Sequence, residues 1–301
     1  MNKVAVLMST YNGEKYLREQ IDTILAQKGE FELSLFVRDD GSKDSTIEIL
    51  KEYEENKGIT WYQGNNYGAA KSFIDLIRNT KGYDYYAFAD QDDYWVEDKI
   101  ERAISKISKE LPMLYCGNGI VVNEKLEELG SFVYSKQPSL DFNTVLCVGG
   151  LLGCTMVFND KLAQLVRDKD MPEKIVMHDF YIALICAGVG GKIVYDHIGK
   201  IKYRQHGANV VGVSYGVMGK IKNRIRNITK KQKVSIQDQA EAILDRYEDV
   251  ILSKNMKLLK QVASYKKSFM SRLKLALSRK TRYVNWNKCI TLRLSILLGN
   301  R

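Results

Sequence analysis

The sequence predicts an α/β fold built on a mainly parallel sheet. Three observations predict it: short β-rich runs alternate with helical patterns near the N-terminus, the first of these runs is continuously apolar, and polar residues collect where the runs end. Such alternation is typical of βαβ units. A continuous apolar run is expected for a strand covered on both faces. Open α/β sheets bind ligands at the carboxyl ends of their strands, so we expect the functional site at that edge.

The expected elements follow in chain order. The first four strands cover residues 4–8, 33–37, 59–62 and 85–89, and the helices between them cover residues 14–28, 45–56 and 69–79. In the first helix, apolar residues recur on one face at helical spacing, so this face should pack on the sheet. The later expected elements are a helix at 98–110, strands at 114–116 and 120–123, a pocket-lining loop and strand within 144–159, a helix at 179–187, a strand at 192–195 and a polar loop at 203–207.

Length and composition limit the class of protein. The chain has 301 residues, of which 45% are hydrophobic, enough for one large or two medium domains and too apolar for disorder throughout. No apolar run approaches the ~20 residues that a membrane-spanning helix needs. The apolar run at 4–8 is too short for the core of a signal peptide, so we expect a cytoplasmic protein.

Cysteine usage indicates a reducing compartment. The five cysteines are odd in number and contain no CxxC spacing, so we interpret them as reduced thiols that form neither a disulfide framework nor a zinc site. They are Cys116, Cys147, Cys154, Cys186 and Cys289.

Charge divides the chain into two parts. Residues 215–301 hold 21 Lys and Arg against five Asp and Glu, whereas residues 1–214 hold 25 against 31. No acidic residue follows Asp249. We therefore predict a catalytic domain at 1–214 and a basic region at 215–301 that is attracted to an anionic surface.

Residues 90–93 have the sequence Asp-Gln-Asp-Asp and form the most informative cluster. Three carboxylates directly after a buried strand repel one another, so a cation should lie beside them. Hard oxygen ligands suit Mg²⁺ or Mn²⁺, which proteins hold through one or two carboxylates together with substrate phosphates. The alternative is a solvated acidic turn that caps the following helix.

Two further polar clusters end the first two strands. Residues 39–46 can place an acceptor beside a ligand base or ribose, although Ser42, Asp44 and Ser45 also suit an ordinary helix cap. Asp39 is harder to explain as a cap. Residues 9–13 have the sequence Ser-Thr-Tyr-Asn-Gly and are also consistent with a simple turn.

Histidine is scarce, which makes two positions worth weighing. Asp179 follows His178 and opens a helix in an apolar neighbourhood, so its carboxylate is a candidate general base. His206 lies near Arg204, and this pair could contact phosphate or metal. A satisfied core histidine and a loop hydrogen-bond network are the alternatives.

Together these motifs resemble a family-2 glycosyltransferase with the GT-A fold. The resemblance covers about residues 3–213 and rests on MSTYNG at 8–13, VRDDGS at 37–42, NYG at 66–68 and FADQDDYW at 88–95. Within that family, ADQDD at 89–93, HD at 178–179 and YRQHG at 203–207 are similar to bacterial rhamnosyltransferases of surface polysaccharide assembly. His178 departs from the many relatives that carry an acidic residue before the base.

The resemblance implies roles for individual residues on the donor side. Ser9, Tyr11 and Asp39 would surround the nucleotide base, with Thr10 and Asp40 close by. Arg204 would be among the cations that stabilise the departing diphosphate.

The resemblance also implies a metal site and a base. Residues 90–93 would correspond to the DxD motif, with Asp92 as the first candidate ligand of Mn²⁺ or Mg²⁺ and Asp90 or Asp93 meeting the ribose or the ion. His206 would lie near the diphosphate and the metal. Asp179 would take the proton from an acceptor hydroxyl that attacks opposite the leaving nucleoside diphosphate, so the anomeric configuration would invert.

The implied reaction is transfer of a sugar, suggested to be L-rhamnose from dTDP-L-rhamnose, onto a lipid-linked or growing glycan at the inner face of the membrane. Three other classes stay open. A sugar nucleotidyltransferase would need a Gly-rich basic first turn, which residues 9–13 lack; a glycosidase would need two carboxylates flanking a bond and no diphosphate site. A polysaccharide-binding module would release no nucleotide.

The basic region has its own pattern. Residues 220–233 contain seven cations and no acid, and from residue 251 apolar residues recur at helical spacing among lysines. The recurring residues are Leu252, Met256, Leu259, Ala263, Met270, Leu273 and Leu277. Basic amphipathic helices bind anionic membrane surfaces. A helical bundle that packs on the enzyme or forms a homo-oligomer is the alternative, and without a zinc-finger or RNP motif we expect no nucleic-acid partner.

Overall fold

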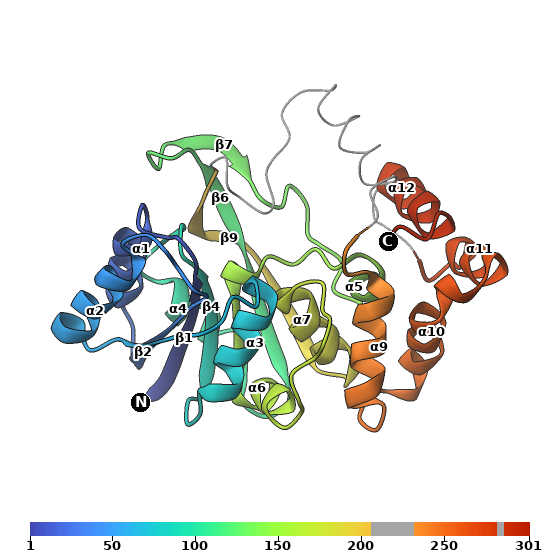
Figure 1. Ribbon diagram of the computed structural model, residues 1–301, viewed down its shortest axis with the longest axis horizontal. Coiled ribbons are helices and arrows are strands. Elements are labelled where there is room, and N and C mark those ends of the chain that lie inside the picture. Colours follow the sequence, from blue (N-terminus) through green and yellow to red (C-terminus); the bar gives the residue numbers. More distant parts are fainter. Residues whose placement is uncertain (206–231, 282–285) are drawn as a thin grey trace.

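The computed structural model describes residues 1–205, 232–281 and 286–301. Within these residues nine strands form one sheet in the order β3-β2-β1-β4-β8-β6-β9-β5, and β7 pairs with β6 beyond this path (Figure 1). The strands are β1 (Asn2–Thr10), β2 (Phe31–Asp39), β3 (Thr60–Gln63), β4 (Tyr85–Asp90), β5 (Tyr94–Trp95), β6 (Met113–Val122), β7 (Glu128–Phe132), β8 (Met156–Asn159) and β9 (Lys192–Arg204).

The first four strands run parallel with β1 at the centre, and this half of the sheet is buried on both faces. Val4, Val6 and Met8 of β1 point into the apolar core on one side, while Ala5 and Leu7 point into the core on the other. All five are fully buried. The continuous apolar run is therefore a strand covered on both sides, and the predicted α/β fold with a mainly parallel sheet is confirmed.

Helices cover both faces of the sheet and then form a group at one end of the molecule (Figure 1). The helices that follow the first strands are α1 (Leu17–Leu25), α2 (Thr46–Lys57), α3 (Ala69–Asn79) and α4 (Lys99–Ile104). The later ones are α5 (Phe142–Val148), α6 (Asp160–Arg167), α7 (His178–Gly188), α9 (Ile236–Tyr247), α10 (Ser253–Ala263), α11 (Phe269–Leu277) and α12 (Trp286–Leu297). Short 3-10 turns cover Gly153–Thr155 and Tyr265–Lys267.

Strand register brings the polar strand ends together. Thr10 at the end of β1 pairs with Asp39 at the end of β2, and Ser9 pairs with Asp90 at the end of β4. Because parallel strands share one direction, these three ends meet at a single edge of the sheet. The sequence placed the candidate site at this edge.

Several later elements differ from the sequence expectation. The two strands expected at 114–116 and 120–123 are one strand, β6 (Met113–Val122), since the glycines near its middle are accommodated as shifts of register against β9. Strand β9 runs on to Arg204 instead of ending at Tyr195, so Tyr203 and Arg204 belong to a strand and not to a loop.

Helices also differ from expectation. Residues 144–148 were predicted to be loop but belong to α5, because Asp141 caps this helix by accepting a hydrogen bond from the Thr144 amide at 3.1 Å. The expected helix at 98–110 ends at Ile104, and the Ser105 hydroxyl donates to the Arg102 carbonyl at 2.8 Å.

The described helices of the basic region pack on the sheet domain. A capping box at Ser235 and Asp238 starts α9, which contacts α5 and α7, and α10 packs on α9 and α5. Ile243 and Leu259 belong to the same apolar core as Leu7 of the central strand. The predicted boundary at residue 214 lies outside the described residues, as do most of the cations of 220–233.

A buried arginine fastens the loop after β2. The Arg38 guanidinium is ion-paired with Asp40, and its Nε lies 3.0 Å from an oxygen of Asp75. It also donates to the Asn65 carbonyl at 2.9 Å and lies over the Tyr67 ring. Breaking a buried pair leaves an uncompensated charge, so this arginine should contribute strongly to stability.

We expect Arg38→Ala to lower the free energy of unfolding by about 3–5 kcal/mol, because it leaves Asp40 buried without its partner. Arg18→Ala is the matched control: Arg18 pairs with Glu52 at 2.6 Å on the exposed surface, and its loss should cost at most about 1 kcal/mol. Urea denaturation followed by circular dichroism measures both. Equal losses in the two variants would contradict the assignment.

Candidate active site

A cavity of about 1170 Å³ opens at the carboxyl edge of the sheet. Its walls come from the loops after β1 and β4, from the start of α7 and from the C-terminal region. Among the lining residues are Ser9, Tyr11, Asp40, Asp90, Asp92, His178, Asp179 and Arg301. The cavity therefore joins motifs that lie far apart in the sequence.

The acidic loop after β4 divides its carboxylates between the cavity and the interior. Asp90 and Asp92 line the cavity, whereas Asp93 is only 1% exposed and is not among the lining residues. Gln91 holds the loop against β1, since its Oε1 accepts from the Thr10 hydroxyl at 2.6 Å and from the Tyr11 amide at 2.8 Å. The loop is thus fixed to the neighbouring strand.

Electrostatics show a surplus of negative charge in this loop. Burial raises the pKa of Asp90 to about 7, and the charges of Asp92 and Asp179 add to the effect. Burial likewise raises the pKa of Asp93 well above its usual value. The Oδ2 atom of Asp93 has no hydrogen-bond partner in the described part of the chain.

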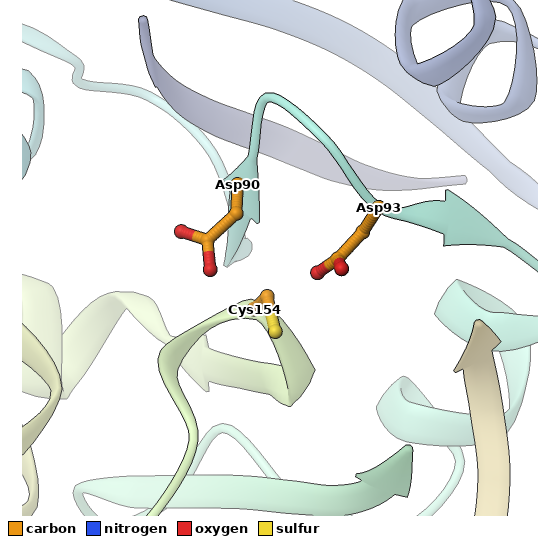
Figure 2. Close-up of side chains that lie close together, drawn as sticks. All are labelled: Asp90, Asp93 and Cys154. Carbon is orange, nitrogen blue, oxygen red and sulfur yellow. The ribbon is translucent and has the colours of Figure 1, made fainter. Parts of the chain in front are cut away.

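Asp90, Asp93 and Cys154 lie close together, with possible ligand atoms within 4.8 Å of one another (Figure 2). Cys154 is fully buried, and burial raises the pKa of its thiol well above the usual value, so the sulfur is protonated. A neutral thiol is a poor ligand for hard cations. Asp90 and Asp92 both line the cavity, so we expect their carboxylates to be better ligands for Mg²⁺ or Mn²⁺ than the three-residue cluster.

The donor set therefore fits a divalent cation. Two carboxylates line one cavity, and burial together with the charges of Asp92 and Asp179 raises the pKa of Asp90. A divalent ion would supply compensating positive charge. Of the predicted metal ligands, Asp90 and Asp92 are brought together, while His206 lies outside the described residues.

A lysine lies behind the acidic loop. Lys99 is 2% exposed, and its Nζ lies 3.5 Å from the centre of the Trp95 ring. Burial lowers the pKa of Lys99 to about 7, against the opposing attraction of Cys154 and Asp93. This cation interacts with the buried side of the acidic loop and not with the cavity.

Asp179 stands at the start of α7 with its carboxylate held in place. One oxygen accepts from the Phe180 amide at 2.6 Å and the other from the Gly153 amide at 3.2 Å. The absence of a side chain at Gly153 lets its backbone come close to the start of α7, because a Cβ there would lie 2.7 Å from Nε2 of His178. Burial raises the pKa of Asp179 to about 6, which suits a general base.

His178 is a neutral wall residue. Its ring stacks on Phe73 with 3.8 Å between ring centres and meets the edge of Phe88. Burial lowers the pKa of His178 to about 3, so the ring carries no charge at physiological pH. Neither ring nitrogen has a hydrogen-bond partner within the described residues.

The end of β1 and the residue after it place two of the three predicted residues in the cavity. Ser9 and Tyr11 line the wall, and Tyr11 is 45% exposed. Thr10 is buried and donates to Gln91, so it positions the acidic loop instead of facing the cavity.

Asp39 and Asp40 are buried and bonded to the chain around them. Asp39 accepts from the Gly41 amide at 3.0 Å and the Ser42 amide at 2.9 Å, and it does not line the cavity. Asp40 accepts from the Gly68 amide at 2.8 Å and lines the cavity beside its partner Arg38. The proposed contacts of both residues with a nucleotide stay predictions.

Arg204 fastens the acidic loop to β9. Its Nε donates to the Asp92 carbonyl at 2.9 Å, its Nη1 donates to the Glu124 carbonyl, and Nη2 pairs with Glu19. The guanidinium is not among the groups that line the cavity. The contact of Arg204 with a diphosphate therefore stays a prediction.

The loop predicted to line a pocket within 144–159 does so at residues 148–153, but the sequence did not single out three individual residues at the site. Gln91 lies inside the recognised motif, but nothing in the sequence shows that its amide bonds back to Thr10 and Tyr11. Cys154 and Gly153 lie in an apolar segment without a polar signal. The glycine-rich composition of that segment is the one sign of close packing.

The fold and the site define a class. The chain has the GT-A fold, because it superposes on S. aureus TarS 1–349 in complex with UDP with a TM-score of 0.54 at 15% identity. The match covers 99% of this chain and 90% of that one. The complex of the same fragment with UDP-GlcNAc matches equally well, and the longer TarS chain is covered over 55% of its length.

Sequence comparison relates the first part of the chain to a known family. Residues 5–145 match the family described as Glycosyl transferase family 2, so this part of the chain is similar to the glycosyltransferases of that family. The chain is 29% identical to the dTDP-rhamnosyl transferase RfbG of Shigella flexneri over 241 residues, or 76% of this chain and 82% of that protein. An uncharacterized glycosyltransferase of Rickettsia typhi is 27% identical over 254 residues, covering 80% and 77%.

We expect transfer activity to fall below about pH 6, the pKa to which burial raises the Asp179 carboxyl. The sign follows from the role, since a base must be ionised to accept a proton and protonation at lower pH removes it. The measurement is kcat/KM against pH at saturating Mn²⁺. A profile that stays flat from pH 8 to pH 5 would remove Asp179 as the base.

Proposed function

We propose that this chain is an inverting, metal-dependent glycosyltransferase that uses a nucleotide-sugar donor. The observation that carries the proposal is the meeting of Asp90, Asp92 and Asp179 at one cavity, with an oriented carboxylate whose pKa is tuned toward neutrality. The similarity of residues 5–145 to glycosyl transferase family 2 supports the reaction class. A sugar nucleotidyltransferase or a binding module would leave the oriented carboxylate unexplained.

The donor occupies the end of the cavity beside β1 and β2. Tyr11 supplies an exposed aromatic face against which a base can stack, and Ser9 and Asp40 supply polar groups nearby. Asp39 and Thr10 do not contact the donor directly. Asp39 hydrogen-bonds the loop after β2, and Thr10 hydrogen-bonds the acidic loop after β4. This arrangement supports a nucleotide at the carboxyl edge of the sheet.

Asp179 performs the proton transfer. Its two amide hydrogen bonds orient the carboxylate, leaving lone pairs for an acceptor hydroxyl. The acceptor oxygen attacks the anomeric carbon while its proton passes to Asp179, and the bond to the nucleoside diphosphate breaks on the opposite face. The product therefore has inverted configuration.

Asp90 and Asp92 would hold Mn²⁺ or Mg²⁺, ions that neutralise charge developing on a leaving diphosphate. Family-2 glycosyltransferases generally use a divalent metal. Arg204 and Gln91 keep the carboxylates at the cavity, because both side chains hydrogen-bond the acidic loop to neighbouring strands. Holding these groups in advance means that little reorganisation is needed during the reaction.

The donor sugar proposed is L-rhamnose carried by dTDP, on the strength of the similarity to RfbG. The acceptor proposed is a lipid-linked or growing glycan, which places the enzyme at the inner face of the cell membrane. Among the described residues, no helix is both long and apolar enough to cross a bilayer. Membrane contact would then be peripheral.

We expect Asp179→Asn to lower kcat by about 10²- to 10⁴-fold, because it removes the base while keeping the shape of the side chain. Donor binding, measured by calorimetry, should stay within about threefold of wild type. The control is Asp245→Asn on the exposed surface of α9, which should keep full activity. Wild-type turnover by the Asp179 variant would refute the mechanism.

We expect Mn²⁺ with dTDP-rhamnose to raise the melting temperature of the wild type, since a ligand at 100 times its Kd stabilises the folded state by about 2.7 kcal/mol. UDP and GDP sugars serve as comparisons. Asp90→Asn and Asp92→Ala should abolish the shift. An equal shift with EDTA in place of Mn²⁺ would contradict the metal assignment.

Asp90→Asn should also stabilise the metal-free protein at pH 8, because burial raises the pKa of Asp90 to about 7 and disfavours its charged form. The gain should shrink toward pH 5, where the wild-type carboxyl is itself protonated in the folded state and is no longer a buried charge. Thermal unfolding of the wild type and the variant at the two pH values measures this gain in stability. An equal gain at both would show that the buried charge of Asp90 is not its source.

A further inference from the structure

Burial divides the C-terminal helices into two kinds. Leu259 and Ala263, which continue the apolar pattern seen in the sequence, are buried in the main core. By contrast, Phe269, Met270 and Leu277 of α11 are 58%, 69% and 66% exposed. All four helices add side chains to the main core, but α11 and α12 also present large apolar side chains to solvent.

Exposure on α11 and α12 follows the helical period. On α11, Met270, Lys274 and Leu277 share one exposed face at spacings of four and three, while Leu275 and Ala276 are buried. On α12 and just after it, one face exposes Ile290, Leu294 and Leu298, and the other buries Cys289, Leu292 and Ile296. We call the six exposed residues the α11–α12 surface: Phe269, Met270, Leu277, Ile290, Leu294 and Leu298.

Positive charge accompanies this surface. The exposed cations of the same segment are Lys267, Lys274, Arg279 and Lys280, and the sequence has no acid after Asp249. A second copy of this chain would bring like charges together at the same face. A lipid surface with anionic headgroups offers both an apolar boundary and the opposite charge.

The α11–α12 surface is connected to the cavity. The chain leaves α12 at Leu297, and Arg301 lines the cavity and donates to the Val148 carbonyl at 3.1 Å. Figure 1 shows α12 and the C-terminal end beside α5, which Val148 ends. Val148 lies a few residues before Gly153, the partner of Asp179.

We infer that the α11–α12 surface docks the enzyme on an anionic membrane, with its apolar side chains in the headgroup boundary and its lysines and arginines on the lipid phosphates. Docking there brings the Arg301 side of the cavity toward the lipid surface, where a lipid-linked acceptor would present its glycan. This last step rests on the proposed function, whereas the lipid binding does not.

The test is flotation of the full chain with vesicles of phosphatidylcholine, with and without 30% phosphatidylglycerol. The triple variant Phe269→Ser/Met270→Ser/Leu277→Ser should bind the anionic vesicles at least tenfold more weakly than wild type. Leu294→Ser/Leu298→Ser should weaken binding in the same direction. Leu111→Ser, an exposed leucine remote from this region in the sequence, is the matched control and should bind as wild type.

Charge is tested separately. Lys267→Glu/Lys274→Glu should weaken binding to anionic vesicles, and high salt should weaken wild-type binding, since exposed charges are screened. Unchanged flotation of both apolar variants, or equal wild-type binding to neutral vesicles, would overturn the inference. So would a wild-type dimer in analytical ultracentrifugation that the triple variant converts to monomer, because the surface would then join two copies.

The design separates this inference from the proposed function. Melting temperature and circular dichroism establish that each variant is folded. Hydrolysis of the nucleotide sugar, or transfer to a water-soluble acceptor, should be the same in the wild type and the triple variant. Loss of lipid binding with normal catalysis supports the docking surface, whereas lipid binding without catalysis in the wild type would refute only the proposed function.

Discussion

The structure depends on keeping several carboxylates partly out of water at one edge of a parallel sheet. The pKa of Asp90 rises to about 7 and that of Asp179 to about 6, because burial disfavours their ionised forms. Such an arrangement costs stability in the protein without ligands and becomes useful when a cation and a diphosphate bind in the cavity. Groups of this kind are concentrated at functional sites, where stability is sacrificed for chemistry.

The rest of the fold holds these carboxylates in place. Parallel register sets the ends of β1, β2 and β4 side by side, Gln91 ties the acidic loop to β1, and Arg204 ties it to β9. Arg38 fixes the loop after β2 from within the core. The start of α7 then brings Asp179 to the same cavity from a segment almost ninety residues further along the chain.

Much of this could be predicted from the sequence, for physical reasons. Helix 69–79 and the strand ending at Asp90 agree with expectation because their apolar periodicity is strong and turn residues flank them. Helix α5 was missed because its signal is a single cap, Asp141, before a glycine-rich segment. Cys154 and the contacts of Gln91 were missed because contacts between distant segments leave no local pattern. Arg204 was expected in a loop beside a ligand, but it ends strand β9 and its guanidinium pairs with Glu19.

The central claim is that Asp90 and Asp92 hold a divalent ion that meets the diphosphate of the donor at the carboxyl edge of the sheet. A crystal structure of the chain grown with dTDP and Mn²⁺, with anomalous diffraction data for manganese, tests it most directly. We expect an anomalous peak within coordination distance of an oxygen of Asp90 or Asp92 and of the diphosphate, with the base near Tyr11. A nucleotide bound elsewhere, or one bound in this cavity without a manganese peak, would contradict it.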